Sequence, residues 1–148
     1  MKQKDIIGRV ERIVLPELAT APLYARIDTG AKTSSISASA RLDKDGQLHV
    51  TFLGFDTEVT KTFRHFSKTV VASSNGHAQE RYKVLLSLTL KKRKIRAHFT
   101  LADRTTQVYP ILIGRNVLYG KFIVDVTKGT PLTEAEHART EGLQGGEE

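Results

Sequence analysis

The chain has 148 residues, of which 39% are hydrophobic, enough for one domain with a single core. It contains no cysteine, which excludes disulfides and a cysteine nucleophile, and no apolar run is long enough to cross a bilayer. The net charge is +7, but residues 1–127 hold 21 of the 23 lysines and arginines and only 11 of the 16 acids, a local charge of +10.

Short β-strands separated by turns account for most of the sequence. We expect strands at residues 6–7, 10–15, 23–27, 48–53, 57–63, 68–72, 81–90, 95–101, 109–113 and 122–126, because these runs are apolar, β-branched or alternating. The segment 43–46 (DKDG) is typical of a turn, and Asn75-Gly76 is a strong hairpin signal. One short helix is predicted from Arg115 onward. Many short strands with turns about every ten residues indicate an all-β protein.

The composition changes near residue 128. We therefore expect one domain at 1–127 and an acidic, flexible tail at 128–148, within which Thr133 and Glu136 form a capping-box pattern for one helical turn. A basic body favours an anionic partner such as RNA or an acidic peptide, or is simply a solvated basic surface. The basic turn at 91–94 has no neighbouring aromatic cluster for base stacking, so nucleic-acid binding is not expected. The N-terminus lacks the apolar segment of a secretory signal, and we expect a cytoplasmic protein that does not enter a membrane.

Two motifs carry the chemistry, IDTGA at residues 27–31 and ILIGRN at residues 111–116. In the first, an acid follows directly after an apolar strand. Gly30 permits a tight turn there and leaves amide groups free to hydrogen-bond the carboxylate of Asp28. The acid is thus expected on a rigid turn with a fixed position.

Together these motifs resemble those of the retropepsin-like aspartic peptidases. Five segments in order (IDTGAKTSSI, SSNGHAQERYKV, TLADR, YPILIGRNVL and VDV) are similar to a bacterial retropepsin-like family often labelled putative ATP-dependent zinc protease. Its members sit beside, or are fused to, ATP-grasp ligases of the ribosomal-protein glutamate-ligase type. The similarity spans residues 9–126 and implies a small, closed acid-protease β-barrel with one short helix.

The resemblance also implies roles for individual residues. The catalytic triplet is Asp28, Thr29 and Gly30. The residues expected to contact substrate, several of them in the flap hairpin that would close the cleft, are Ala31, Lys32, Ser74, Gly76, His77 and Arg81. The residues expected to support the site are Arg104, Gly114 and Arg115.

An aspartic peptidase needs two carboxylates that share one proton, and this chain has a single Asp-Thr-Gly. The second carboxylate must then come from another copy, so the resemblance implies a homodimer that hydrolyses peptide bonds of a peptide or protein through an activated water. The alternative is a non-proteolytic partner or regulator of an ATP-grasp ligase, because fold does not guarantee activity.

Lys32 departs from the retroviral pattern, in which an Asp at this place pairs with the Arg of Gly-Arg-Asn. Arg115 must therefore find another partner. A cation near the dyad favours its ionised form and shifts acid catalysis toward low pH; alternatively, Lys32 receives an acidic side chain from a glutamate-rich substrate.

No cofactor is expected. The five histidines lack the His-Glu-x-x-His spacing of a zinc hydrolase, and a zinc enzyme ranks third among the hypotheses. The chain also lacks a phosphate-binding Gly-x-x-x-x-Gly-Lys-Ser/Thr motif, so any ATP dependence would belong to a partner.

Overall fold

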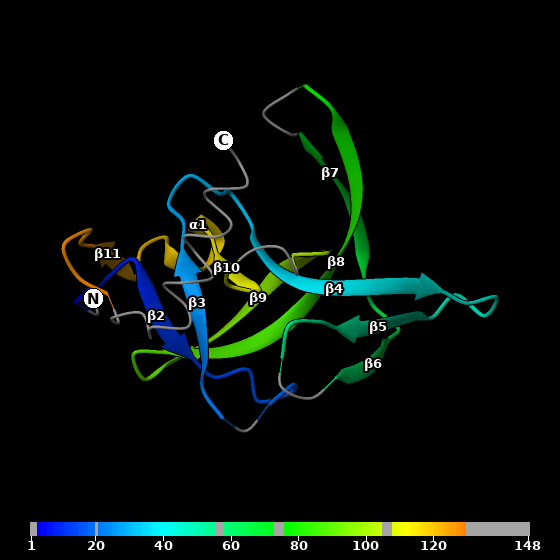
Figure 1. The fold of residues 1–148 in the computed structure, drawn as a ribbon, viewed down its shortest axis with the longest axis horizontal. Helices are drawn as coiled ribbons and strands as arrows, with labels where there is room; N and C mark the ends of the chain where they lie inside the picture. The colour runs from blue at the N-terminus through cyan, green and yellow to red at the C-terminus, as the bar shows by residue number, and fades with distance from the viewer. Residues whose placement is uncertain (1–2, 20, 56–57, 73–75, 105–107, 130–148) are drawn as a thin grey trace.

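The structure is a computed structural model that describes residues 3–19, 21–55, 58–72, 76–104 and 108–129. The described residues form eleven strands and one four-residue helix (Figure 1). The strands are β1 (Asp5–Ile7), β2 (Val10–Ile13), β3 (Leu23–Ile27), β4 (Ser34–Leu42), β5 (Leu48–Phe52), β6 (Val59–Phe63), β7 (Ser67–Ala72), β8 (Ala78–Leu90), β9 (Arg93–Ala102), β10 (Ile111–Ile113) and β11 (Phe122–Val124). The helix α1 (Arg115–Leu118) lies between β10 and β11, where the sequence predicted it.

The main sheet has the order β2-β3-β10-β4-β9-β8-β7. Two strand pairs in the centre of this sheet are parallel: β10 with β3, and β9 with β4. The outer half of β4 continues into an antiparallel meander with β5 and β6. β1 and β11 form a separate two-stranded parallel sheet. Segments far apart in sequence are thereby brought together around the end of β3.

The expectation of an all-β protein with one short helix is confirmed, but the closed barrel is not. Among the described residues, the one β-bridge between these two sides joins Val14, just after β2, to Thr89 of β8 through two backbone hydrogen bonds. The β7–β8 hairpin and the meander of β5 and β6 extend away from the body (Figure 1). The physical reason is that no continuous ladder of backbone hydrogen bonds joins the two sides.

β4 is a strand that the sequence analysis missed. Its sequence, SSISASARL, is rich in serine and alanine, which have a low preference for strands. Ser34, Ser35 and Ser37 are nevertheless buried within it. The hydroxyls of Ser34 and Ser37 both have hydrogen-bond partners, which removes most of the cost of burying them.

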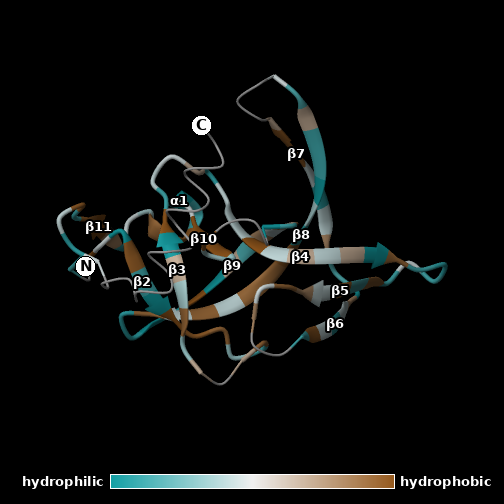
Figure 2. Ribbon diagram, in the orientation of Figure 1, coloured by the Kyte–Doolittle hydropathy of each residue, from teal (hydrophilic) through white to brown (hydrophobic). Residues whose placement is uncertain are grey.

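The core is formed by the buried side chains of the strands, mostly aliphatic residues and phenylalanines at alternating positions. Its fully buried side chains include Ile13, Ile36, Phe52, Leu86, Phe99, Ile111 and Ile113. β8 leaves this core partway along its length, and its outer half is hydrophilic whereas its inner half carries the hydrophobic positions (Figure 2). The outer part of the β7–β8 hairpin is thus an exposed arm. No helix in the described part of the chain has the length and apolar character needed to span a membrane.

Candidate active site

The carboxylate of Asp28 is held at the end of β3. Ile27, the last residue of that strand, is buried, and the amide of Asp28 donates to the carbonyl of Ile113 over 2.8 Å. The amide of Gly30 donates to Asp28 Oδ1 over 2.9 Å. A Cβ at residue 30 would lie 3.2 Å from this same oxygen. The backbone amide of residue 30 is the hydrogen-bond donor to the carboxylate. Because glycine has no Cβ, nothing crowds the carboxylate oxygen that accepts this bond.

The Gly-Arg-Asn segment crosses directly beside the Asp28 loop. The amide of Arg115 donates to the carbonyl of Ala31, and the amide of Asn116 donates to the carbonyl of Lys32. A Cβ at Gly114 would lie 2.8 Å from the carbonyl oxygen of Ala31, so only glycine permits this approach of two backbones. The two motifs, far apart in sequence, form one rigid unit.

Ser34 and Asn116 fasten this unit to the main sheet. Asn116 Oδ1 accepts from the amide and the hydroxyl of Ser34, over 2.9 and 2.8 Å, and Asn116 Nδ2 donates to the carbonyl of His98. The Ser34 hydroxyl in turn accepts from the amide of Gly114. The sequence analysis assigned no individual role to either residue, although Asn116 ends the ILIGRN motif and Ser34 lies within IDTGAKTSSI.

Arg115 finds a different partner from the one that retroviral enzymes provide. Its Nη1 donates to the carbonyl of Thr29 over 3.0 Å, so the guanidinium braces the backbone of the Asp-Thr-Gly turn itself. Lys32 is exposed beside this turn. The side chain of Thr29 is exposed as well.

Arg104 carries a positive charge into the vicinity of Asp28. It is half-buried, its amide donates to Ser37 Oγ, and its Nε is buried without a hydrogen-bond partner among the described residues. Burial, then the charges of Arg81 and Arg26, lower the pKa of Arg104, whereas the charge of Asp28 raises it. Three arginines and one carboxylate thus share a single electrostatic neighbourhood.

The predicted flap residues that the structure describes lie just before β8 or on it. Gly76, with a φ of 86°, and His77 are exposed in the connection before β8, and Ser74 lies outside the described residues. Arg81 is half-buried on β8, where its Nε and Nη2 both donate to Gln79 Oε1 over 3.2 Å. The charge of Arg81 acts on Arg104, as the charge of Asp28 does.

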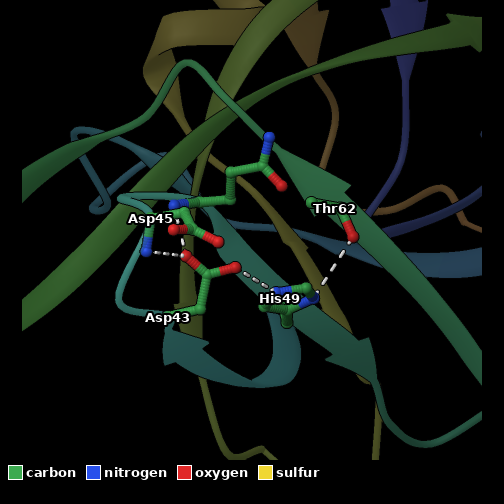
Figure 3. A network of polar contacts seen from close by, with 5 residues as sticks. Asp43, Asp45, His49 and Thr62 are labelled. Atoms are coloured by element: carbon green, nitrogen blue, oxygen red, sulfur yellow. Dashed lines mark hydrogen bonds and ion pairs between the residues drawn. The ribbon is translucent and has the colours of Figure 1, made fainter.

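A second polar network joins β4, β5 and β6 (Figure 3). Asp43 Oδ1 accepts from the amides of Asp45 and Gln47, and its Oδ2 lies 2.7 Å from His49 Nε2. His49 Nδ1 lies 3.3 Å from the hydroxyl of Thr62. The hydrogen bond from Gln47, then that of His49, lowers the pKa of Asp43. The order of acid, imidazole and hydroxyl is that of a nucleophilic triad. Asp43, however, accepts hydrogen bonds from two backbone amides of its own turn, which is the pattern of an aspartate that stabilises a turn.

In the part of the chain that the structure describes, no three His, Cys, Asp or Glu side chains lie close enough together to hold a metal ion. His137 lies outside the described residues.

Comparison with known proteins gives a family match over most of the chain. A sequence profile of the RimB-like family, described as retropepsin-like aspartic endopeptidase RimB, matches residues 6–131. A crystal structure of a Legionella pneumophila protein of unknown function superposes with a TM-score of 0.69 at 25% identity, covering 86% of this chain and 97% of that one.

Two curated relatives are each described as a probable alpha-L-glutamate ligase. The protein from Desulfotalea psychrophila is 31% identical over 130 residues, which are 82% of this chain and 28% of that protein. The protein from Shewanella pealeana is 31% identical over 150 residues, which are 96% of this chain and 33% of that protein. The chain thus spans about a third of the length of these relatives.

Proposed function

Because the chain belongs to the RimB-like family of retropepsin-like aspartic endopeptidases, we propose that it hydrolyses peptide bonds as a cytoplasmic homodimer to which each copy contributes Asp28. The observation that carries this proposal is the Asp28 carboxylate at the end of a buried strand, fixed by the amide of Gly30 and braced through Arg115. No metal or other cofactor is required for this chemistry.

In the proposed dimer, two Asp28 carboxylates face each other and share one proton, because like charges so close cannot both ionise. The ionised carboxylate accepts a proton from a water as its oxygen attacks the scissile carbonyl. The protonated carboxylate gives its proton to the carbonyl oxygen, which yields a neutral tetrahedral diol. The carboxylate that took the proton from water then gives it to the leaving nitrogen, while the other carboxylate takes a proton from a diol hydroxyl. The C–N bond breaks, and the dyad again holds one shared proton.

A second copy has an apolar surface to cover. Ile6 of β1 and Ile123 of β11 are register partners, and their side chains are 51% and 52% exposed. Burial of such aliphatic side chains drives association. In the proposed dimer, the exposed hydroxyl of Thr29 would bond to the partner's loop.

We further propose that the substrate peptide is acidic. Lys32 is exposed beside the Asp-Thr-Gly turn. The charge of Asp28 acts on Arg104, on which the charge of Arg81 also acts, so positive charge accompanies the carboxylate. Carboxylates form strong, charge-assisted hydrogen bonds with arginine. The relatives are described as probable alpha-L-glutamate ligases, and a description that concerns glutamate supports the same substrate chemistry.

A second candidate function is a non-proteolytic partner of such a ligase. The observation that favours it is the match of nearly the whole chain to about a third of proteins described as probable alpha-L-glutamate ligases. In that case, the domain would regulate the ligase, and the effect on the ligase would not need the Asp28 carboxylate.

The test is the Asp28→Asn variant, compared with the unmodified protein on glutamate-rich and neutral peptides. The peptidase proposal expects hydrolysis to fall by at least about a thousandfold, since the dyad acts as a unit. It also expects an unchanged mass by light scattering and full activity of the unmodified protein after chelation. Retention of hydrolysis by Asp28→Asn would refute the peptidase proposal. Stimulation of a purified ligase that survives Asp28→Asn would instead support the regulator.

A further inference from the structure

One face of β9 carries three basic side chains in a row. Lys94, Arg96 and His98 are exposed and alternate with the buried residues Ile95 and Ala97, so all three project to the same side of the strand. Neighbouring members of this basic strip (Lys94, Arg96 and His98) are two residues apart, which is about 6.7 Å along a strand. The strip therefore presents basic groups at a regular spacing.

The strands beside the basic strip do not balance its charge. Its register partners on β8 are the uncharged residues Thr89, Ser87 and Leu85. Arg96 Nη1 donates to Ser87 Oγ over 2.9 Å, and within the described residues no carboxylate lies within 4.0 Å of a basic nitrogen of the strip. Glu17 Oε1 accepts instead from the backbone amide of Ser87, over 2.6 Å. An acidic partner from outside the chain would supply the missing charge.

The cations next to the strip are, by contrast, already paired. Arg93 Nε lies 2.7 Å from Asp5 Oδ2, and Lys91 Nζ lies 3.7 Å from Glu11 Oε1. The lack of an ion pair is thus a property of this face of β9 and not of the whole β8–β9 hairpin.

The basic strip projects from the same face of the main sheet as Asp28. One row of register partners crosses β3, β10, β4 and β9, and its members point to one face: Arg26, Leu112, Ser35 and Thr100. Asp28 follows the row's member on β3 by two residues, and His98 precedes the member on β9 by two residues. Since side chains alternate along a strand, Asp28 and the strip share that face.

Asn116 brings one end of the strip next to the Asp28 loop. Its Nδ2 donates to the carbonyl of His98 over 2.9 Å, and its amide donates to the carbonyl of Lys32 over 3.1 Å. A peptide that leaves the site past the exposed Lys32 therefore meets His98 first, then Arg96 and Lys94. From His98 to Lys94 the strip is about 13 Å long, the length of about four residues of extended peptide.

We propose that the basic strip is a second binding surface for the acidic substrate and holds a glutamate-rich part of the peptide that lies outside the site at Asp28. Alternate side chains of an extended peptide repeat at about 6.7 Å, so every second glutamate can meet one basic side chain. Exposed ion pairs are individually weak, so a run of acids binds better than a single one. The effect on hydrolysis rests on the proposed peptidase function, whereas the binding does not.

The test measures binding of an octaglutamate peptide to the full chain with Asp28→Asn, which does not cleave the peptide. Lys94→Gln with Arg96→Gln should raise the Kd by about tenfold, as expected for the loss of two exposed ion pairs. Arg41→Gln with Lys61→Gln is the matched control, because it removes the same charge from exposed positions on β4 and β6 and should change the Kd by less than about twofold. Isothermal titration calorimetry at about 0.05 M salt measures both.

A further measurement places the peptide on the protein. Octaglutamate should shift the NMR amide signals of the basic strip, and about 1 M salt should abolish these shifts. Lys94→Gln alone leaves the bond between Arg96 and Ser87 intact and should still weaken binding, which guards against a folding defect in the double variant. Equal losses in the double variant and its control would overturn the proposal. Tighter binding of a single-stranded RNA octanucleotide than of octaglutamate would also overturn it, in favour of a nucleic-acid surface.

Hydrolysis separates this proposal from the peptidase itself. In chains that retain Asp28, the Lys94→Gln and Arg96→Gln double variant should raise the KM for a glutamate-rich peptide and leave kcat unchanged, because contacts remote from the scissile bond are the same in the ground and transition states. An unchanged KM with intact hydrolysis would refute the second surface and leave the peptidase. Strip-dependent binding of octaglutamate by a chain that hydrolyses nothing would refute the peptidase and support the surface.

Discussion

The loop that carries Asp28 is positioned by buried residues behind it. Ser34 donates to Asn116 Oδ1 and accepts from Gly114, so its hydroxyl joins β4 to the segment that crosses the Asp28 loop. Ser34 is fully buried, and water cannot replace a lost partner easily. The exact position of the Asp28 carboxylate therefore depends on the buried hydroxyl of Ser34.

Ser34→Ala is expected to lower the free energy of unfolding by about 1–3 kcal/mol, because a buried amide of Gly114 loses its acceptor. Urea denaturation measures this change. Ser39 is the matched control: it lies on the same strand but is exposed, and Ser39→Ala should change stability by less than about 0.5 kcal/mol. Equal losses in the two variants would show that the Ser34 hydrogen bonds contribute nothing specific.

At the scale of the elements, strands with aliphatic or alternating patterns were predictable. β3 begins and ends where expected, and the short helix begins at Arg115 as predicted. β4 was missed because hydroxyl partners outside the strand decide its burial, and no local pattern encodes them. The basic turn was expected to span four residues, but only Lys91 and Lys92 form it, both with positive φ, because β9 begins at Arg93.

The hydrogen bonds around Asp43 stabilise the β4–β5 hairpin, and they make its stability depend on pH. The pKa of Asp43 is lowered below its ordinary value of 3.8, mainly by the amide of Gln47 and then by His49. A carboxyl whose pKa is lower in the folded state stabilises the fold at pH values above the ordinary value. This contribution is lost as the pH falls through the lowered pKa, in the acid range below 3.8.

The amide signals of Gln47 and Asp45 should therefore titrate in NMR spectra with a midpoint below 3.8. In His49→Ala, the midpoint should rise, because the second-largest cause of the lowered pKa is removed. Thr62→Val serves as the control, since it removes only the 3.3 Å contact to the far side of the imidazole. An unchanged midpoint in His49→Ala would mean that the imidazole does not stabilise the ionised carboxyl.

At the scale of the whole molecule, the sequence predicted the family and the two motifs of the site, but not the arrangement that supports them. The motifs are local in sequence and specific, so they could be identified without a structure. Arg26, Arg81 and Arg104 are far apart in sequence, and the effect of the first two charges on Arg104 arises only in the folded chain, so sequence spacing gives no signal of it. The open side between β2 and β8 is likewise a property of strand pairing at a distance.

A dimeric active site and an active site within one subunit lead to different results when active and inactive subunits are mixed. If each active site needs two Asp28 carboxylates, inactive Asp28→Asn subunits will capture unmodified ones in mixed dimers with one carboxylate. After equal amounts are mixed and allowed to exchange at low concentration, activity per unmodified subunit should fall to about half, and a tenfold excess should reduce it to about a tenth. The control is Asp45→Asn, an equivalent change in the exposed β4–β5 turn, whose addition should contribute activity instead of removing it. Light scattering over the same concentrations reports whether the variants still associate. If activity per unmodified subunit stays constant while mixed dimers form, one Asp28 suffices, and the shared-proton mechanism does not apply to this chain.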